Sequence, residues 1–229
     1  MDKDLPADPL LPRVCCLSGL LGSLLFLTGD MLWYGGWTSG AGFHSHAVMA
    51  QRPDAIIILA AALGPVAALF SAVGMGIFFL TLEPAGRRLA ATAAALLAVM
   101  MLIGGAYHAL YGCFGFTERI QDASIRQVLT AQVAALRDGV SYPMYAAGVV
   151  GTLLVYALAL TRRTRFPRWL VLLLPTTLSE ASTLFHAAFL TIPAPLGGWL
   201  LGGWINGSFV LFFAIATPVF WRLGAEGGT

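Results

Sequence analysis

The sequence is poor in charged residues. Only 10% of its 229 residues are Asp, Glu, Lys or Arg, whereas 58% are hydrophobic. A soluble domain carries roughly 25% charged residues and could not keep so much apolar surface away from water. The composition therefore excludes an ordinary soluble protein, and it predicts that membrane lipid surrounds the chain.

Net charge and cysteine are also scarce. The formal charge is +2, and the basic residues are scattered in short loops with no stripe that could follow a phosphate backbone, so nucleic acid is not an expected partner. The three cysteines, Cys15, Cys16 and Cys113, lie in apolar stretches, and the adjacent Cys15 and Cys16 lack the spacing of metal ligands. Structural disulfides are therefore not expected.

Familiar catalytic motifs are missing as well. The sequence has no Gly-x-Ser-x-Gly, no His-Glu-x-x-His, no phosphate-binding glycine loop and no Cys-x-x-Cys-His. Short motifs therefore do not identify a reaction.

What the sequence does contain is six apolar windows of the length that a membrane-spanning helix needs, about 20 residues. The predicted spans are residues 14–37, 55–80, 89–114, 141–160, 169–192 and 199–221. They leave an N-terminal tail of residues 1–13 and a C-terminal tail of residues 223–229. The predicted fold class is all-α, a polytopic membrane helix bundle.

The distribution of Lys and Arg predicts the orientation of this bundle, because cytoplasmic loops retain basic residues during insertion. With both termini in the cytoplasm, nine basic residues lie on the cytoplasmic side and four on the other. We therefore expect both tails inside and a multi-pass protein of the bacterial inner membrane.

The connector between the third and fourth spans, residues 115–140, is too polar to cross a membrane. Its apolar residues nevertheless approximate one helical face: Ile120, Ile125, Val128, Leu129, Val133 and Leu136. We expect an interfacial helix here, either a lid over an outward-facing site or a simple connection.

Several polar residues lie inside the predicted spans, where an ionisable group costs about 2.5–3.5 kcal/mol by insertion scales. Asp30, His108, His186 and Asn206 are each six or seven residues from the outer end of their span, which places them roughly 10 Å deep. The shared depth predicts one polar layer in the outer half of the bundle. Interhelical hydrogen bonding is the alternative interpretation for each of them.

Other polar residues belong near this layer. Glu180 is deeper, near mid-membrane, and is a candidate for a second layer. Glu180 and Asn206 are the candidate catalytic groups that would support the metal site. Hydroxyl groups can support the layer from neighbouring positions. These supporting residues are Tyr107, Tyr111, Ser141, Tyr142 and Ser182. His44 and His46 form a His-x-His pair in the first outer loop that could bind a metal or cover the site.

The stretch from Gly22 to Tyr34, Gly-Ser-Leu-Leu-Phe-Leu-Thr-Gly-Asp-Met-Leu-Trp-Tyr, precedes His108 and His186 on later spans. In these features the chain resembles an uncharacterised family of bacterial multi-span membrane proteins, a domain of unknown function. The resemblance implies a membrane location and no particular activity. The Asp and His set is also broadly similar to that of seven-span metal-dependent lipid amidases, although this chain has six predicted spans.

Four functions fit these residues. Asp30, His108 and His186 could bind Zn²⁺ and activate water for hydrolysis of a lipid or another amphiphilic small molecule. Asp30, Glu180 and the histidines could instead form a proton or cation relay in a transporter. His108 and His186 could hold haem b for electron transfer. Finally, the polar layer could only hold the helices of a structural membrane subunit together.

Overall fold

The computed structural model describes residues 10–226, without the side chains of residues 182, 183 and 222–226. The predicted tails therefore lie largely outside the described residues. The described part of the chain is helical and contains no strand. Its long helices are α1 (Leu10–Tyr34), α3 (Asp54–Gly74), α5 (Arg87–Tyr111), α7 (Ala123–Thr161), α8 (Pro175–Thr191) and α9 (Leu196–Glu226). The short ones are α2 (Ser45–Ala50), α4 (Gly76–Leu82), η1 (Glu83–Ala85), α6 (Cys113–Thr117) and η2 (Arg168–Leu173).

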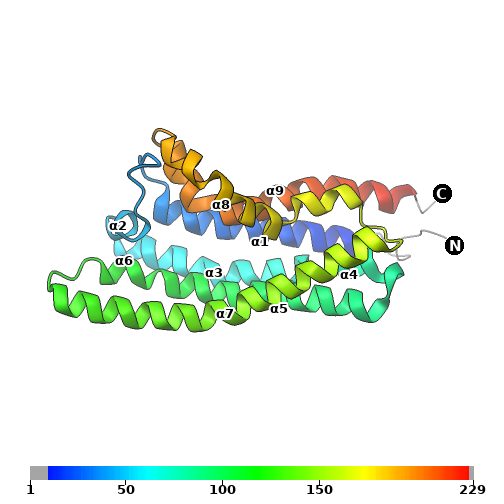
Figure 1. Cartoon of the computed structure of the whole chain (residues 1–229), viewed down its shortest axis with the longest axis horizontal. Coiled ribbons are helices and arrows are strands. Elements are labelled where there is room, and N and C mark those ends of the chain that lie inside the picture. The colour runs from blue at the N-terminus through cyan, green and yellow to red at the C-terminus, as the bar shows by residue number, and fades with distance from the viewer. Residues whose placement is uncertain (1–9, 227–229) are drawn as a thin grey trace.

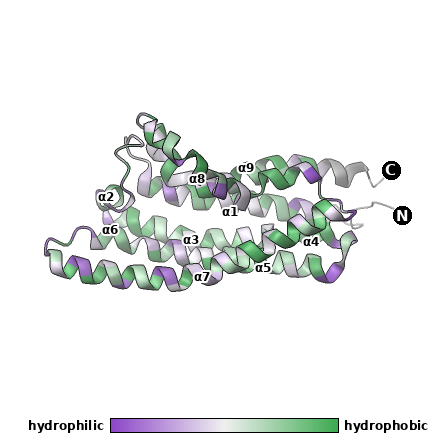
Figure 2. Ribbon diagram, viewed as in Figure 1, coloured by the Kyte–Doolittle hydropathy of each residue, from purple (hydrophilic) through white to green (hydrophobic). Residues whose placement is uncertain are grey.

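Five helical stretches are long and apolar enough to cross a membrane, which makes this a membrane protein. They are Leu10–Tyr34, Asp54–Ala85, Arg87–Thr117, Ala123–Thr161 and Leu196–Trp221. Figure 2 shows that hydrophobic residues cover most of their length. Many large apolar side chains face outwards, including Leu69 and Leu153, as expected where lipid replaces water.

The predicted span at residues 169–192 is not one continuous helix. The short helix η2 ends at Leu173, Leu174 is extended with ψ 134°, and α8 begins at Pro175. A proline disfavours helical backbone in the residue before it and lacks the N–H that would continue the helix, which explains the break. Hydropathy alone does not predict this interruption, because it carries no information on backbone continuity.

The predicted connector helix is not a separate element. Residues 123–140 form the first half of α7, which begins where Asp122 accepts hydrogen bonds from the backbone N–H groups of Ser124 and Ile125. At 39 residues, α7 is roughly 58 Å long, whereas the apolar core of a bilayer is about 30 Å thick. Placement of its first half on the membrane surface stays a prediction.

The helices form two layers joined through α1 (Figure 1). In one layer α3 packs against α5, and α5 packs against α7. In the other α8 packs against α9. The central helix α1 packs against both α3 and α9. The described start of α1 and end of α9 lie at the same end of the bundle (Figure 1).

Small residues allow α1 and α3 to approach closely. A Cβ atom added to Gly22 would lie 2.3 Å from Oγ of Ser71, and one added to Gly74 would lie 2.4 Å from Cα of Gly19. Membrane helices commonly associate through such small-residue contacts, because lipid supplies no hydrophobic force between them. The position of α1 between the two layers therefore depends on these glycines.

We expect Gly22→Ala to destabilise the bundle by about 2 kcal/mol, because overpacking forces α1 away from α3. Thermal unfolding of the protein in detergent measures the effect. Gly139→Ala is the matched control, since nothing lies within 4 Å of a Cβ atom at that position. Equal unfolding temperatures for the two variants would contradict this description of the helix contact.

Candidate functional site

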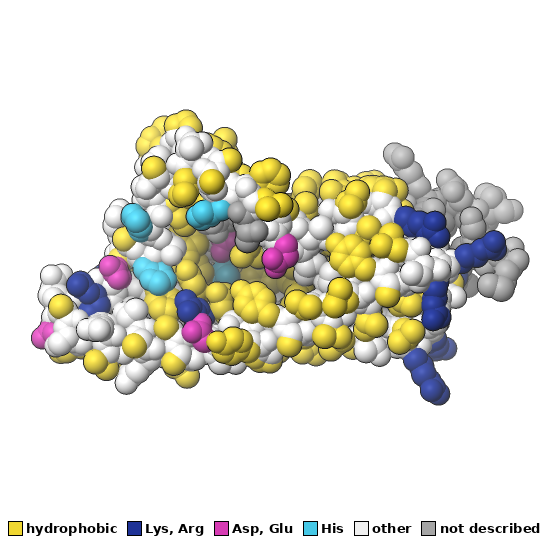
Figure 3. All heavy atoms as spheres, in the orientation of Figure 1, with side chains coloured by type: hydrophobic (Ala, Val, Ile, Leu, Met, Phe, Trp, Pro, Cys, Tyr) yellow, Lys and Arg dark blue, Asp and Glu magenta, His cyan; other side chains and the backbone are white. Residues whose placement is uncertain are grey.

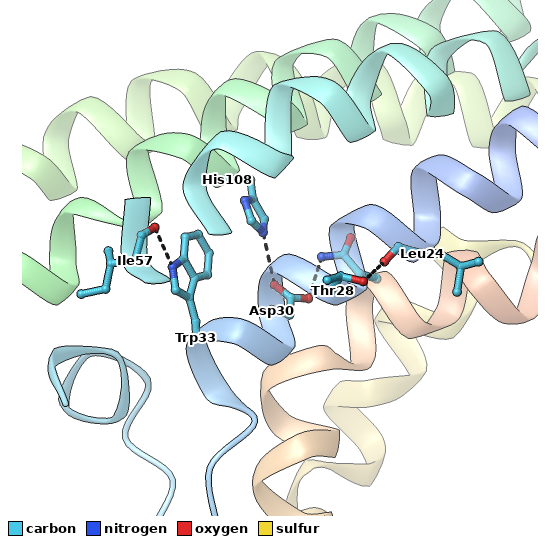
Figure 4. Close-up of polar contacts among 7 residues, drawn as sticks. Leu24, Thr28, Asp30, Trp33, Ile57 and His108 are labelled. Atoms are coloured by element: carbon cyan, nitrogen blue, oxygen red, sulfur yellow. Dashed lines mark hydrogen bonds and ion pairs between the residues drawn. The ribbon is translucent and has the colours of Figure 1, made fainter. Parts of the chain in front are cut away.

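The structure brings together three of the polar residues that share a predicted depth. Nδ2 of Asn206 on α9 donates a hydrogen bond to Oδ2 of Asp30 on α1 at 2.7 Å. Nε2 of His108 on α5 lies 3.5 Å from Oδ1 of the same carboxyl group. Figure 4 shows the imidazole pointing from α5 towards Asp30. One carboxyl group thus contacts the amide and the imidazole of two other helices.

Asp30 and His108 are both buried, with 6% of each residue exposed. Asp30 lies on a face of α1 that also carries Phe26, Gly29 and Trp33, since residues three and four apart on a helix share a face. This face is buried against the rest of the bundle. The carboxyl group is therefore directed into the protein and does not reach towards the membrane surface.

The imidazole of His108 lies in a slot whose walls include two glycines. A Cβ atom on Gly29 would be 2.8 Å from its Cε1 atom, and one on Gly64 of α3 would be 2.9 Å from its Nδ1 atom. The indole of Trp33 stacks on the imidazole at a centroid distance of 4.3 Å. The ring of Phe26 meets it edge-on at 5.5 Å. These four residues define the His108 slot.

Trp33 is itself held at both its side chain and its backbone. Its indole Nε1 donates to the carbonyl oxygen of Ile57 on α3 at 3.3 Å (Figure 4). Its own carbonyl oxygen accepts a hydrogen bond from Nε of Arg52 at 3.0 Å. The stacking surface for His108 is therefore fixed from two sides.

The contact between His108 and Asp30 is loose. At 3.5 Å it is longer than an ordinary N–H···O hydrogen bond, and among the described residues neither ring nitrogen of His108 has a hydrogen-bond partner. An unsatisfied buried polar group is costly, and such groups in native proteins call for an explanation. A proton shared between the imidazole and the carboxyl group would keep the pair neutral overall inside the membrane.

The other predicted site residues lie elsewhere. His186 and Glu180 are both on α8 and exposed, and neither contributes to the contacts around Asp30. Tyr142 is 72% exposed on α7, and the hydroxyl of Ser141 donates to the carbonyl oxygen of Asp138. The side chain of Ser182 lies outside the described residues. Tyr107 and Tyr111 are half-buried near the outer end of α5.

A space-filling view shows a hollow between α8 and the layer of α5 and α7 (Figure 3). Histidine and acidic side chains gather around it, and some of them lie at its floor (Figure 3). Few residues connect α7 to α8 directly, and Oγ1 of Thr152 donates to Oγ1 of Thr176 at 3.0 Å where they meet. The hollow therefore separates the two layers of the bundle.

One protein family matches nearly the whole chain. The model of the family of unknown function DUF6796 matches residues 8–221. The chain belongs to this family. The family match covers all five candidate spans and every residue of the site. No curated protein and no solved structure matched the chain.

The geometry does not assemble the predicted zinc site. Catalytic zinc usually has three protein ligands, and among the described residues no three His, Cys, Asp or Glu side chains lie close enough to hold a metal ion. Asp30 and His108 supply two ligands, and His186 does not join them. Zinc binding stays a prediction, for which Asp30 and His108 are the two candidate ligands that meet.

The two ring nitrogens of His108 face different parts of the protein. Nε2 of His108 faces Asp30, and Nδ1 faces Gly64, where even a single added carbon atom would be 2.9 Å away. Haem binding by His108 and His186 stays a prediction.

Sequence reasoning missed the residues that build the slot. Trp33 is three residues from Asp30 and so shares its helical face, which is a usable signal in the sequence. Gly64 carries no such signal, because the crossing of α3 and α5 that places it beside His108 is a tertiary contact.

We expect Gly29→Ala to displace the imidazole of His108, because the new methyl group would occupy its Cε1 side. The ¹⁵N resonances of the His108 side chain should shift. Gly104→Ala is the matched control on α5, since its Cβ atom would meet only Sδ of Met144 at 3.6 Å. Unchanged His108 resonances in Gly29→Ala would refute the slot.

The outer histidine His46 should make stability depend on pH. Its ring stacks on Phe114 at 4.2 Å, and burial lowers its pKa from 6.5, partly offset by Glu118. Because the unfolded chain then binds protons more readily, stability should fall as pH drops through 6.5 and below. His46→Phe should reduce this loss in thermal unfolding measured across that range, and an unchanged pH dependence would contradict the assignment.

Proposed function

We propose that this protein is a proton-coupled membrane transporter in which Asp30 and His108 bind and release the coupling protons. The observation that supports this best is the loose contact between a buried carboxyl group and a buried imidazole on different helices. Ionisable residues in the membrane interior commonly mark ion pathways and proton relays. Within the proposal, the 3.5 Å contact is a proton-binding pair and not only a structural link between helices.

Protonation of the pair would change its charge at a point where a net charge is costly. With one proton shared, the pair is neutral overall; a second proton makes it positive, and loss of the first makes it negative. A neutral carboxyl group can donate a hydrogen bond, whereas a carboxylate only accepts. The hydrogen bonds that Asp30 makes with its partners therefore depend on how many protons the pair carries.

The Asp30–His108 pair lies where a change in its charge can affect both helix layers. Asp30 lies on α1, which packs against both layers, and its two partners lie one in each layer, Asn206 on α9 and His108 on α5. A change in the charge of Asp30 would strengthen one contact relative to the other. The layers border the hollow of Figure 3, so such a change can alter access to it.

Proline residues give the helices places to bend. Pro65 follows Gly64 inside α3, Pro143 lies inside α7, and Pro218 lies inside α9. A proline inside a helix removes one backbone hydrogen bond and is a common cause of kinks. In the proposed transporter these positions, with the break before α8, allow the layers to move relative to one another.

The proposed transporter also has a finer topology. In addition to the five spans, η2 and α8 together would make a broken sixth crossing of the membrane. With six crossings, both termini lie on the same side, in the cytoplasm of a bacterium. Broken spans are typical of transporters, where irregular backbone lines a cavity. The first half of α7 would lie at or beyond the outer membrane surface, with its apolar face against lipid.

Hydrolysis of an amphiphile is the main alternative from the sequence, and the contacts favour it less. Its zinc mechanism needs a third ligand beside Asp30 and His108, and the exposed His186 on α8 does not supply one among the described contacts. Proton binding requires only the two groups that do meet.

Proton flux into liposomes tests the proposal. Purified protein is reconstituted with a pH-sensitive dye inside, and a pH gradient is applied across the membrane. We expect Asp30→Asn and His108→Gln to reduce the flux to that of protein-free liposomes, because either change removes the proton-binding pair.

Glu83→Gln is the matched control. Glu83 is a carboxylate in η1, at the opposite end of the bundle, and pairs with Arg87 at 3.8 Å on the surface. It should leave the flux unchanged. Full flux in folded Asp30→Asn would exclude Asp30 as the coupling residue.

A further inference from the structure

Both hydrogen bonds that hold Trp33 come from one short stretch of the chain, residues 52–57. The carbonyl oxygen of Trp33 accepts from Nε of Arg52 at 3.0 Å, and its indole Nε1 donates to the carbonyl oxygen of Ile57 at 3.3 Å. This 52–57 segment leads from the end of α2 into the first turn of α3. Because the indole stacks on His108, the position of the 52–57 segment affects one wall of the His108 slot.

The contact from Arg52 closes the outer end of α1. The last carbonyl groups of a helix have no partner within the helix, and Trp33 is the last residue but one of α1. A guanidinium group at this end supplies both a hydrogen-bond donor and a positive charge at the negative pole of the helix dipole. A Cβ atom on Gly36 would lie 3.1 Å from Nη2 of Arg52, so the guanidinium lies against the chain just beyond the helix. Arg52 therefore fixes the backbone that carries the indole.

A single side chain, that of Arg119, ties this stretch of the chain at three points. Its Nε donates to the carbonyl oxygen of Ala50 at 2.7 Å. Its Nη2 donates to the carbonyl oxygen of Arg52, and its Nη1 pairs with the carboxylate of Asp54. A planar guanidinium presents five donors in a fixed arrangement, which suits several acceptors on one stretch of backbone. Arg119 thus holds the end of α2, the start of α3 and the residue between them that bonds Trp33.

Arg119 is itself held by α6, which packs against α2. Its guanidinium carbon lies 5.6 Å from the centre of the Phe116 ring, and 32% of its side chain is exposed. The pair with Asp54, whose side chain is 68% exposed, contributes little alone, because water weakens exposed ion pairs. The two contacts with backbone carbonyl groups are part-buried, and such charge-assisted hydrogen bonds are stronger. They are the contacts that hold the 52–57 segment.

We infer that Arg119 is a positioning residue, which acts through the 52–57 segment to hold Trp33 against the imidazole of His108. Its consequence for proton exchange rests on the proposed function, which supplies the proton-binding pair. The imidazole lies 3.5 Å from the Asp30 carboxyl group, so a ring that loses its stacking partner no longer keeps that distance. Arg119 contacts neither member of the pair in the described hydrogen bonds and binds none of the coupling protons.

NMR of the purified protein in detergent, with ¹³C-labelled histidine, tests the positioning. An indole stacked on an imidazole shifts the imidazole ring protons upfield, and the His108 signal is the one that disappears in His108→Gln. We expect Arg119→Gln to move this signal downfield, because Trp33 no longer stays stacked on the ring. The signal of His186 on α8 should stay in place, which distinguishes a local change from unfolding of the bundle.

Arg52→Ala is the second variant, and it should move the His108 signal in the same direction. Arg119 binds the backbone carbonyl of residue 52, which alanine retains, so this change removes only the contact with Trp33. Arg162→Gln is the matched control, because Nη1 of Arg162 also donates to a backbone carbonyl oxygen, that of Ala85, at 2.8 Å at the opposite end of the bundle. A wild-type signal in Arg119→Gln, or an equal movement in Arg162→Gln, would overturn the inference.

Proton flux into liposomes tests the consequence of the positioning. Arg119→Gln should lower the flux about tenfold, the factor that corresponds to one hydrogen bond, and Arg162→Gln should leave it unchanged. Full flux in Arg119→Gln with a displaced His108 signal would overturn the link between the stacking and proton exchange. Absence of flux in the wild type would overturn the proposed function instead. The NMR measurement needs no transport, so it would still decide whether Arg119 positions Trp33.

Discussion

The burial of one carboxyl group in a lipid-embedded helix bundle is the constraint on which the rest of the site depends. Asp30 cannot reach water by extending along α1, because its helix face packs inside the protein. Charge in the membrane interior is costly, so the group needs partners that share its proton or its hydrogen bonds. Asn206 supplies one such partner and His108 the other.

The glycines and Trp33 follow from the same constraint. An imidazole can lie between three membrane helices only if those helices lack side chains where the ring lies, and Gly29 and Gly64 provide that space. Trp33 closes one face of the ring, and its hydrogen bond to α3 prevents it from turning away. The site is rigid around the imidazole, while the contact between the imidazole and the carboxyl group stays loose. That combination suits a group that changes its protonation state without unfolding its surroundings.

The fold is largely predictable from hydropathy, because span length is set by bilayer thickness. Five of the six apolar windows correspond to helical stretches long and apolar enough to cross a membrane. The remaining window, residues 169–192, contains Pro175, which stops the helix at a point that hydropathy does not detect. The polar first half of α7 resembles a connector with a helix of its own, although the backbone runs on into the span without a break.

Depth predicts part of the site. Asp30, His108 and Asn206 have similar depths and do meet, whereas His186 has the same depth and lies exposed on α8. Depth along the membrane normal is one coordinate of three; the rotation of a helix and its neighbours depend on packing. The contact of α1 with both α5 and α9 residues cannot be read from the spacing of residues along the chain.

Infrared spectroscopy of the Asp30 carboxyl group tests the proton-binding role most directly. A protonated carboxyl group absorbs separately from a carboxylate, so its population can be followed across a pH titration of the purified protein. We expect a protonated carboxyl band that titrates, is missing in Asp30→Asn and changes its midpoint in His108→Gln. A spectrum without any titrating carboxyl band that depends on Asp30 would contradict this role and leave the contact with His108 as a structural link between helices.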